Sequence, residues 1–496
     1  MKICLIYYCE NAGRTERINT HLGIAYIASM LIQNGFMVDV YDCPFMNISY
    51  EQLLEYLKNN KYDAVGLSTY YFNSNDVLRV SEYIKSLNDQ IFVFIGGYLP
   101  TQYYEKMDRY FSFIDCMVIG EGEFTSLRLL RNFKNGKWKN SKGIAYLDEN
   151  KIRYTGNCDP VNNLDILPFP YRVPCAKDFP IATVSTSRGC YGNCNYCSIQ
   201  QMIKASNCKR LRKRSPENVI YEIKQFEDNE NKKTILFADD NFSLRSKNDK
   251  IWFDNFSQLI IKHNIDVDFF CEIRADDIVY CEEHIEKFKK IGLKSIFIGI
   301  ENFVQKHLDF YNKNITVETN LKALQTLESL QIAYSFGFML FNPIITIKDI
   351  FDNIIVLEQI FKNNKYLFPD RLISNSAAIA YPGTSFEDFI VKNDLQLNKE
   401  EGYRIIDEKA FLCKKAANIW GKLAQRYFSL AANINDVSIR QKWSLEILKL
   451  DIQFLYHISN LINENKIVSI PEITPIINEQ HGYLVTLKNK LGLNYL

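Results

Sequence analysis

Short apolar runs alternate with amphipathic stretches over the first part of this chain, and no other pattern restricts its fold as much. Runs of β-branched and aromatic residues are typical of buried strands, and periodic apolar positions between them are typical of helices. A regular alternation of this kind predicts a doubly wound α/β fold with a parallel sheet. The expected strands cover residues 2–8, 37–41, 64–69, 91–95 and 116–119.

Polar residues and glycines follow three of these runs. Ligands of doubly wound sheets bind beyond the carboxyl ends of the strands, so we expect a ligand at this edge. Glycine lets the backbone approach a bulky ligand closely, although glycine after a strand also serves as an ordinary turn. The residues concerned are Ser68, Thr69, Gly96, Gly97, Gly120 and Glu121.

The alternation returns in a longer form between residues 181 and 390. It predicts a partial, open barrel of six strand–helix units, with strands at 181–185, 234–237, 267–272, 295–300, 334–340 and 372–380. Functional groups of such barrels gather at the carboxyl ends of the strands. The polar residues found there are Asp239, Asp240, Asn241, Arg274, Asp276, Glu301, Asn302, Tyr381 and Thr384.

These patterns divide the 496 residues into four regions, which is reasonable because a single core seldom supports so long a chain. Residues 1–140 form the first α/β domain, and residues 181–390 form the barrel. The prolines of residues 141–180 predict a linker without regular structure. Residues 391–496 predict a small helical domain, with helices at 412–434 and 437–462.

Cys190, Cys194 and Cys197 form a C-x-x-x-C-x-x-C cluster just after the first barrel strand. Three thiolates can bind three irons of a cubane 4Fe-4S cluster and leave the fourth iron open to another ligand. A structural zinc site needs a second ligand pair, a ferredoxin site needs a fourth cysteine at its own spacing, and disulfide frameworks are typical of small secreted chains. None of these patterns fits, so we expect an open iron–sulfur cluster.

With Tyr196 just before the third cysteine, this cluster resembles the signature of the radical S-adenosylmethionine (SAM) family. The resemblance implies that Cys190, Cys194 and Cys197 bind the 4Fe-4S cluster and that S-adenosylmethionine chelates its open iron. Electron transfer from the reduced cluster then cleaves the cofactor and gives a 5'-deoxyadenosyl radical. Tyr196 is expected at the same cofactor site.

The resemblance also suggests roles for residues at the barrel strand ends. Arg274 is expected to pair with the carboxylate of S-adenosylmethionine, since a guanidinium offers a charge-assisted fork. Glu301, which follows Gly299 in a Gly-Ile-Glu run, is expected to accept hydrogen bonds from the ribose. Asp239 and Asp240 resemble a family element near the cofactor or the cobalamin edge. Paired carboxylates also suit general acid–base catalysis, and helix capping is the structural alternative.

Three glycine-containing runs of the first domain resemble the Rossmann-like cobalamin-binding domain found ahead of many radical SAM proteins; they are Leu22-Gly23, Gly96–Thr101 and Gly120–Thr125. The D-x-H-x-x-G element that supplies a histidine to cobalt in other cobalamin proteins is absent, and Leu99 stands where this family often has histidine. His21 is the only histidine of the domain. We therefore expect a lower cobalt face without a histidine ligand. Tyr70 and Tyr71 either line that face or pack as ordinary core.

The charge balance gives no sign of a polyanionic partner. The formal net charge is +1, from 59 basic and 58 acidic residues, so no global field favours nucleic acid or a membrane surface. The basic run 209–214 is expected to be a solvated face. No apolar stretch is long enough for a membrane span and the amino terminus begins with a strand-like run, which predicts a cytoplasmic protein.

Two cofactors on one chain predict an enzyme that methylates an unactivated carbon of a small-molecule or peptide substrate, with a reductant such as flavodoxin or ferredoxin as partner. Cobalamin-associated rearrangement or cyclisation is the alternative within the family. Methylthiolation of transfer RNA would need three further cysteines in the first domain, and only Cys9 and Cys43 have a suggestive spacing. An iron–sulfur electron carrier without turnover is the alternative from another class.

Overall fold

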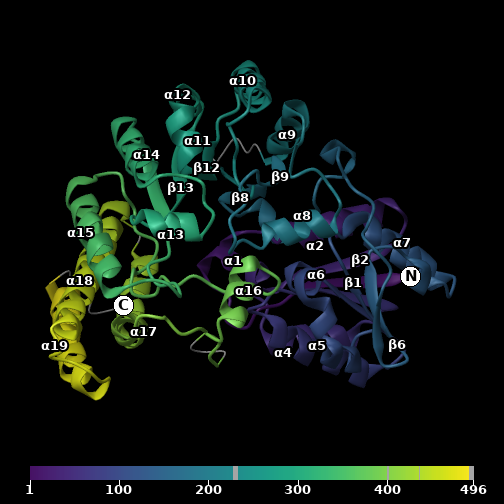
Figure 1. Cartoon of the computed structure of the whole chain (residues 1–496). Coiled ribbons are helices and arrows are strands. Elements are labelled where there is room, and N and C mark those ends of the chain that lie inside the picture. Colours follow the sequence, from purple (N-terminus) through teal and green to yellow (C-terminus); the bar gives the residue numbers. More distant parts are fainter. Residues whose placement is uncertain (227–232, 399–401, 435, 491–496) are drawn as a thin grey trace.

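The computed structural model describes residues 1–226, 233–398, 402–434 and 436–490. Figure 1 shows the N-terminal sheet and its helices in purple and blue, next to a second α/β unit in teal and green. Three long helices near the C-terminus, in yellow, lie against the second unit on the side away from the first. The two sheets therefore meet directly, which is the arrangement that creates the site described below.

The N-terminal sheet has the strand order β2-β1-β3-β4-β5-β6-β7, and its first five strands are parallel. The five predicted strands are confirmed. Helices cover both faces, with α2 (Leu22–Gln33) and α7 (Glu123–Lys134) on one and α4 (Tyr50–Asn59) and α5 (Ser74–Leu87) on the other. The four inner strands are almost wholly apolar because both of their faces are buried, whereas the edge strand β2 carries Asp39 and Asp42 and is partly exposed. The five parallel strands are β1 (Lys2–Tyr7), β2 (Met37–Asp42), β3 (Ala64–Ser68), β4 (Phe92–Gly96) and β5 (Cys116–Val118).

A β-hairpin extends this sheet into the region expected to be a linker. Strands β6 (Ile144–Asp148) and β7 (Lys151–Tyr154) pair antiparallel, and β6 pairs with β5. Glu149 and Asn150 form the two-residue turn, both with positive φ (48° and 60°). A hairpin turn of this type usually carries a glycine, so the sequence Glu-Asn gave no signal. The expectation of irregular structure is thus wrong for residues 144–154, and the prolines follow the hairpin.

The second sheet has the order β14-β13-β12-β11-β8, and all its strands are parallel. It curves into an open barrel whose outer face is covered by helices, among them α10 (Lys247–Lys262), α12 (Glu282–Lys290), α14 (Val317–Ser329) and α15 (Ile347–Asn363). Five of the six predicted strands are present. They are β8 (Ile181–Val184), β11 (Thr234–Phe237), β12 (Asp268–Arg274), β13 (Leu293–Glu301) and β14 (Ala333–Phe338).

The sixth predicted strand, residues 372–380, is reduced to a single bridge between Phe341 and Ala377. Two of its first backbone donors bind a side chain instead of a neighbouring strand. The carboxylate of Asp451 accepts hydrogen bonds from the N–H groups of Ile373 (2.7 Å) and Ser374 (3.0 Å). This carboxylate also accepts from the indole of Trp420 (2.9 Å), so it ties the segment to the C-terminal helices.

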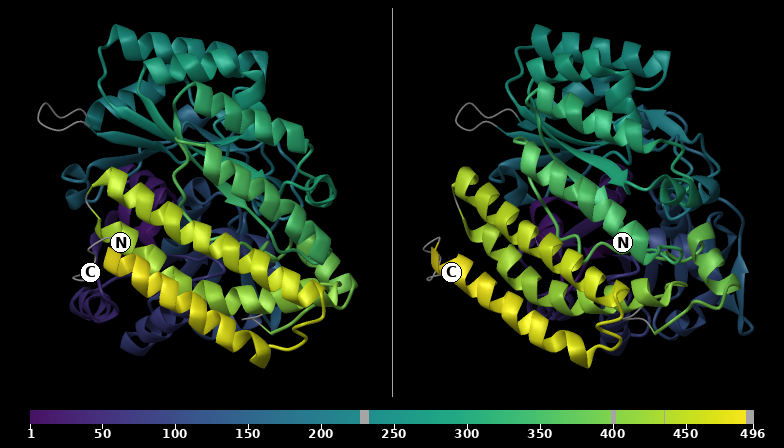
Figure 2. Two further views of the ribbon diagram at one scale, coloured as in Figure 1. Left: turned by 90° about the vertical axis from the view of Figure 1, so that its left-hand side faces the viewer. Right: turned by 60° about the vertical axis from the view of Figure 1, so that its left-hand side comes forward.

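The C-terminal region consists of α17 (Glu408–Phe428), α18 (Val437–Asn463) and α19 (Thr474–Lys490), of which α19 was not predicted. Figure 2 shows these helices side by side, with α18 next to α15. The predicted domain runs to residue 496, and residues 491–496 lie outside the described part. Trp420 and Trp443 belong to the same apolar core as the barrel strands, so these helices complete the barrel core.

Replacing Asp451 with asparagine should destabilise the barrel. The amide cannot accept all three hydrogen bonds, which leaves buried donors unpaired at a cost of about 2–4 kcal/mol. We expect a lower midpoint of thermal unfolding by circular dichroism. The matched control is Asp352→Asn, which breaks an exposed ion pair with Lys348 and should change stability by less than about 0.5 kcal/mol. Equal effects of the two substitutions would contradict this role of Asp451.

Candidate active site between the two sheets

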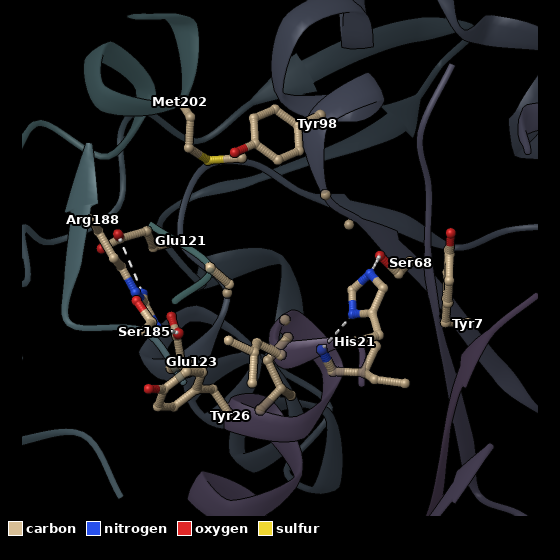
Figure 3. A pocket seen from close by; sticks show the side chains of 18 of the residues that line it. Tyr7, His21, Tyr26, Ser68, Tyr98, Glu121, Glu123, Ser185, Arg188 and Met202 are labelled. Atoms are coloured by element: carbon tan, nitrogen blue, oxygen red, sulfur yellow. Dashed lines mark hydrogen bonds and ion pairs between the residues drawn. The ribbon is translucent and has the colours of Figure 1, made fainter. Parts of the chain in front are cut away.

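A cavity of about 650 Å³ lies where the carboxyl ends of the two parallel sheets meet. Residues that follow β3, β4 and β5 line one side, and residues at the ends of β8, β11 and β12 line the other (Figure 3). Eight of the residues predicted from sequence lie in its wall, namely Ser68, Tyr70, Gly96, Gly97, Gly120, Glu121, Asp239 and Asp240. The predicted ligand edges of the two sheets therefore form one shared site.

Two glycine turns make the floor on the N-terminal side. Gly97 has φ +107°, and a Cβ there would lie 2.9 Å from the carbonyl oxygen of Thr69. Gly120 has φ +81°, and a Cβ there would lie 3.0 Å from the hydroxyl of Ser206. The Thr101 hydroxyl locks the turns together, because it donates to the Gly97 carbonyl (2.7 Å) and accepts from the Gly120 N–H (3.0 Å). A larger residue at either glycine would displace this floor.

His21 lies at the edge of this floor, and the sequence had not assigned it a role. Its Nδ1 accepts a hydrogen bond from the Ile24 N–H (3.2 Å) at the start of α2. The proton of the neutral ring therefore sits on Nε2, which faces the hydroxyls of Ser68 (3.0 Å) and Tyr70 (3.1 Å). Burial lowers the pKa of His21 to about 4. Both ring nitrogens are thus engaged, and the ring is neutral at physiological pH.

Aromatic side chains form the wall above His21. Tyr70 stacks on Phe72 (ring centroids 5.2 Å apart) and on Tyr98 (5.7 Å), and all three line the cavity. Of the two tyrosines predicted to face cobalt or the core, only Tyr70 lines the cavity, whereas Tyr71 is 37% exposed and lies outside its lining. Thr69 is fully buried and its backbone bonds to Gly96 and Leu99, so it supports the floor without lining it.

Two arginines, the buried Arg212 and the half-buried Arg188, join the N-terminal domain to the barrel. Arg188 and Arg212 are register partners in the antiparallel hairpin of β9 (Ser187–Gly189) and β10 (Leu211–Lys213). Arg212 binds both oxygens of Glu121 (2.7 and 2.9 Å), and Arg188 binds Glu123 (2.6 Å) and approaches Glu121 (3.3 Å). We call these four residues the arginine clasp; Figure 3 shows Arg188 beside Glu121.

The clasp changes the expected role of Glu121. Burial raises the pKa of this carboxyl, but the hydrogen bonds of Arg212 and the charge of Arg188 outweigh burial and lower it. Glu121 is therefore held as a carboxylate whose oxygens are occupied by arginine. We predicted Glu121 to bind a cofactor directly, whereas its side chain is used to hold the two domains together.

The three motif cysteines lie on the loop between β9 and α8 (Ile199–Ala205), and each is half-buried with a free thiol. Asn195 ties the loop to the end of α13 (Gln305–Phe310), through its N–H to the Tyr311 carbonyl (3.0 Å) and its side chain to the Phe310 carbonyl (2.6 Å). Burial raises the pKa of Cys190 and raises that of Cys197 to about 12. Bound iron would favour the thiolates.

In the described part of the chain, no three ligating side chains converge on one ion position. The prediction of a cubane rests on the number and spacing of the three cysteines, because each thiolate of such a cluster binds a different iron atom. A mononuclear zinc or iron site would instead require its ligands around a single point.

Asp239 holds the start of the cluster loop. Its carboxylate accepts hydrogen bonds from the N–H groups of Thr186 (2.7 Å) and Ser187 (3.1 Å) and from both of their hydroxyls. Asp240 makes one such bond, from the Gly189 N–H (2.8 Å), and its side chain opens into the cavity. Burial raises the pKa of Asp240 to about 6. Neither residue caps a helix, so that alternative is wrong; α10 is capped by Ser246.

Arg274 contacts the cluster loop from the side of the barrel. Its Nε binds Asp276 (2.9 Å), its Nη2 binds the Lys313 carbonyl (2.8 Å), and its Nη1 points at the thiol of Cys194 (3.8 Å). The side chain of Lys313 pairs with Glu301 (2.8 Å). Gly299 makes room for this pair, because a Cβ there would lie 2.7 Å from the Lys313 ammonium. Glu301 has φ +68°, which turns the chain at the end of β13.

Tyr196 belongs to the cluster loop itself, between Cys194 and Cys197. Its ring meets that of Tyr311 edge-on at 5.3 Å, and burial raises the pKa of its phenol well above the usual value. None of the four residues predicted to bind S-adenosylmethionine on this side lines the cavity between the sheets; they are Tyr196, Arg274, Gly299 and Glu301. Their predicted contacts with S-adenosylmethionine remain predictions.

Glu272 is a cavity residue that sequence reasoning missed. It lies two residues before Arg274 on β12, so both side chains face the barrel interior. Among the described residues, its carboxylate has no hydrogen bond or ion pair, and the neighbouring layer contributes the small side chains of Ser185 and Ala238. Burial, followed by the charge of Asp240, raises its pKa to about 7. The only signal in the sequence was a carboxylate inside an apolar strand.

Residues 184–354 match the radical SAM superfamily, and residues 12–130 match the B12 binding domain. The chain belongs to the radical SAM superfamily and carries a B12 binding domain. The matched residues include the cluster cysteines and the glycine turns described above. This radical SAM protein therefore has three cofactors, which are a 4Fe-4S cluster, S-adenosylmethionine and cobalamin.

Curated relatives and solved structures agree with this assignment. An uncharacterized methyltransferase of Pyrococcus horikoshii is 27% identical over 80% of this chain and 84% of its own length. The anaerobic magnesium-protoporphyrin IX monomethyl ester cyclase of Rubrivivax gelatinosus is 26% identical over 64% of this chain and 58% of its own length. A solved structure of OxsB, a cobalamin-dependent S-adenosylmethionine radical enzyme, contains aqua-cobalamin and S-adenosylmethionine. It superposes on this chain with a TM-score of 0.78 at 16% sequence identity. The superposition covers 99% of this chain and 80% of the OxsB chain. This last similarity shows the fold.

The residues present fit these cofactors. Three free thiols on one anchored loop are the donor set of a cubane with an open iron. The floor of Gly97 and Gly120 has no side chains to obstruct a flat macrocycle, and the wall of Tyr70 and Tyr98 offers it an apolar surface. The engaged nitrogens of His21 agree with the predicted cobalt face without a histidine ligand.

Replacing Asp239 with asparagine should loosen the cluster loop. The amide cannot accept from all four donors of Thr186 and Ser187, which costs about 2 kcal/mol or more. After anaerobic reconstitution, we expect the variant to hold less than half of the parent's iron per chain. Asp240→Asn is the matched control, because its amide oxygen can keep the single bond from Gly189. Full iron loading of the Asp239 variant would refute the anchoring role.

The raised pKa of Glu272 predicts a pH-dependent effect of Glu272→Gln. The folded-state pKa of about 7 lies above the unfolded value, so the stabilising contribution of the neutral carboxyl is lost as the pH rises through 7. The groups that influence it are Asp240, Asp370 and Glu301, which raise the pKa, and Arg371, which lowers it. A glutamine side chain stays neutral at every pH, so it does not place a negative charge in the cavity wall above pH 7. The Glu272→Gln variant should therefore be thermally more stable than the parent at pH 8 but not at pH 5.

The measurement is the midpoint of thermal unfolding of the cofactor-free chain at both pH values. Glu55→Gln on the exposed face of α4 is the control and should give the same difference from the parent at each pH. A pH-independent difference for Glu272→Gln would show that Glu272 titrates as an ordinary exposed carboxylate.

Proposed function

We propose that this radical SAM protein transfers a methyl group to an unactivated carbon of a small-molecule or peptide substrate. Reductive cleavage of S-adenosylmethionine supplies a hydrogen-abstracting species, and cobalamin supplies a methyl group. The observation that carries the proposal is the single cavity with the B12-type floor on one side and the barrel mouth on the other. The three cysteines are outside its lining, but Gly189 and Ile199, at the two ends of the cysteine loop, line it. A substrate held there would therefore lie between the glycine floor and the cluster loop, and proximity would favour transfer. The Pyrococcus relative, named a methyltransferase, supports the same reaction class.

In this proposal the chain's own residues bind, orient and shield the reactants. The arginine clasp fixes the distance between the glycine floor and the cluster loop. The aromatic wall of Tyr70, Phe72 and Tyr98 limits access of water to the floor side. Glu272 and Asp240 present carboxyl groups to the space between the cofactors, where they can hold a donor group of the substrate.

The alternatives have less support. A cyclase is among the relatives, but it is matched over 58% of its own length. Methylthiolation would require a further cysteine set in the first domain. Cys9 and Cys43 are both buried in the apolar core, and no cysteine lies between Cys43 and Cys116. An electron carrier would have no need of a substrate-sized cavity beside its cluster.

The partners in this proposal are the substrate and a one-electron reductant. Radical SAM chemistry consumes an electron at the cluster, which a flavodoxin or ferredoxin can supply. Among the described residues, no helix is long and apolar enough to cross a membrane. We expect no nucleic acid in the cavity, because its arginines are paired with carboxylates.

The proposal predicts two products from S-adenosylmethionine. Anaerobically reconstituted protein with cobalamin and a low-potential reductant should form both 5'-deoxyadenosine and S-adenosylhomocysteine, measured by mass spectrometry. The nucleoside without S-adenosylhomocysteine would favour rearrangement or cyclisation instead. The triple variant Cys190→Ala, Cys194→Ala and Cys197→Ala should lose the nucleoside entirely and still bind cobalamin, as seen in its visible spectrum. Nucleoside formation by that variant would exclude these cysteines as the cluster ligands.

A further inference from the structure

Exposed cations flank the cluster loop on its outer side. The guanidinium of Arg210 donates to the Gly192 carbonyl (2.7 Å), and Gly192 lies between the first two cluster cysteines. The neighbouring Lys209 is also exposed. The next loop residue outward, Asn193, is exposed, so the loop that carries the cluster ligands reaches the surface at this point. The prediction of a solvated face for the basic run 209–214 is correct for Lys209 and Arg210, which are exposed beside the cluster loop. It is wrong for Arg212 and Arg214, which are buried because each pairs with a glutamate.

A surface hollow of about 390 Å³ continues this basic surface on the other side of the loop. It is lined by Tyr191, which precedes Gly192, and by Arg245, which is 44% exposed and stacks on the ring of Tyr280 at 4.3 Å. Lys247, the first residue of α10, is exposed next to it. We call Lys209, Arg210, Arg245 and Lys247 the basic rim. Arg210 thus contacts Gly192, and Arg245 lines the same hollow as the preceding residue Tyr191, so cations of the rim lie beside two consecutive loop residues.

The charge of the rim is not cancelled locally. Asp249, the carboxylate that lines the hollow, binds Lys213 (3.2 Å). Asp276 binds Arg274 (2.9 Å) and makes a longer ion pair with Arg245 (3.7 Å). No ion pair involves Lys209, Arg210 or Lys247 within the described ranges. The whole chain has a net charge of only +1, so four cations at this place form a local positive field.

A positive field around a redox centre attracts an acidic electron donor and orients it during encounter. We propose that the basic rim is the docking surface for an acidic, flavin-carrying electron-transfer protein of the flavodoxin type. The inference rests on the proposed function, since it assumes that the cysteine loop holds the cluster. One electron passes from the flavin hydroquinone, which becomes the semiquinone, to the oxidised cluster, which becomes reduced. The donor sits on the outer face of the loop, and the substrate cavity stays closed to it.

The test compares two charge-reversal variants of the reconstituted holoprotein. The rim variant is Lys209→Glu with Lys247→Glu, two exposed lysines that take no part in the cofactor sites. The control is Lys262→Glu with Lys362→Glu, which changes the net charge equally. Lys262 ends the helix that Lys247 begins, about 22 Å away along its axis, and Lys362 lies in the last turn of α15. Arg210 is left intact because it contacts the cluster loop.

The measured quantity is the second-order rate constant of cluster reduction by a bacterial flavodoxin hydroquinone, followed anaerobically by stopped-flow absorbance at several salt concentrations. At low salt we expect the rim variant to react about ten-fold or more slowly than the parent and to show a weaker salt dependence. The control variant should stay within about two-fold of the parent. Reduced methyl viologen, a small cation that needs no docking surface, should reduce the clusters of the parent and both variants at similar or slightly higher rates.

Equal rates of the rim and control variants with flavodoxin would overturn the proposal. It would also be overturned if the rim variant lost binding of a fluorescent single-stranded RNA while its flavodoxin rate stayed unchanged, because the rim would then serve a nucleic acid. Failure of the proposed function can be distinguished from failure of the docking proposal, because the two depend on different measurements. In that case methyl viologen reduces the cluster without formation of 5'-deoxyadenosine, whereas the docking result still follows from the reduction rates.

Discussion

The arginine clasp is the interaction on which the rest of the site depends. The side chains of Arg188 and Arg212 extend from the hairpin of β9 and β10 and bind Glu121 and Glu123. These two glutamates follow the glycine turn after β5 of the other sheet. Removing one partner of such a buried pair leaves an uncompensated charge, at a cost of about 3–5 kcal/mol. Because Arg188 lies two residues before Cys190, the same contact fixes the cluster loop relative to the cobalamin floor. The charges cancel within the clasp, and among the described residues the carboxyls of Asp240 and Glu272 lie in the cavity wall without an ion pair.

Much of the fold could be predicted from the sequence, because buried parallel strands are continuous apolar runs that stand out between helices. The failures have local physical causes. The hairpin of residues 144–154 turns through Glu149 and Asn150 without glycine, so it gave no turn signal. Residues 372–380 have the apolar composition of a strand, but Asp451, about 75 residues later in the sequence, takes their backbone donors. Such a distant competitor is invisible to any local pattern.

The candidate site was predictable where a residue type alone carries the chemistry, as for the three cysteines and the glycines at strand ends. Roles that depend on partners were not predictable. Glu121 follows a glycine turn as a cofactor ligand would, yet its partners are two arginines some 70 to 90 residues later in the chain. Asp239 and Asp240 are neighbours with different tasks, one holding a loop and the other facing the cavity. Glu272 carries no motif, and it stands out only because its carboxylate lies in the cavity wall without a hydrogen bond or ion pair to any residue that the structure describes.

The central claim is that cobalamin and the iron–sulfur cluster border one cavity between the two sheets. Anomalous X-ray diffraction from anaerobically grown crystals, recorded at the cobalt and iron absorption edges, tests it most directly. We predict a cobalt peak above the floor of Gly97 and Gly120 and an iron peak at the loop of Cys190, Cys194 and Cys197, both open to the same cavity. A cobalt site elsewhere on the protein, or an iron cluster separated from the cobalt by the protein core, would contradict this account.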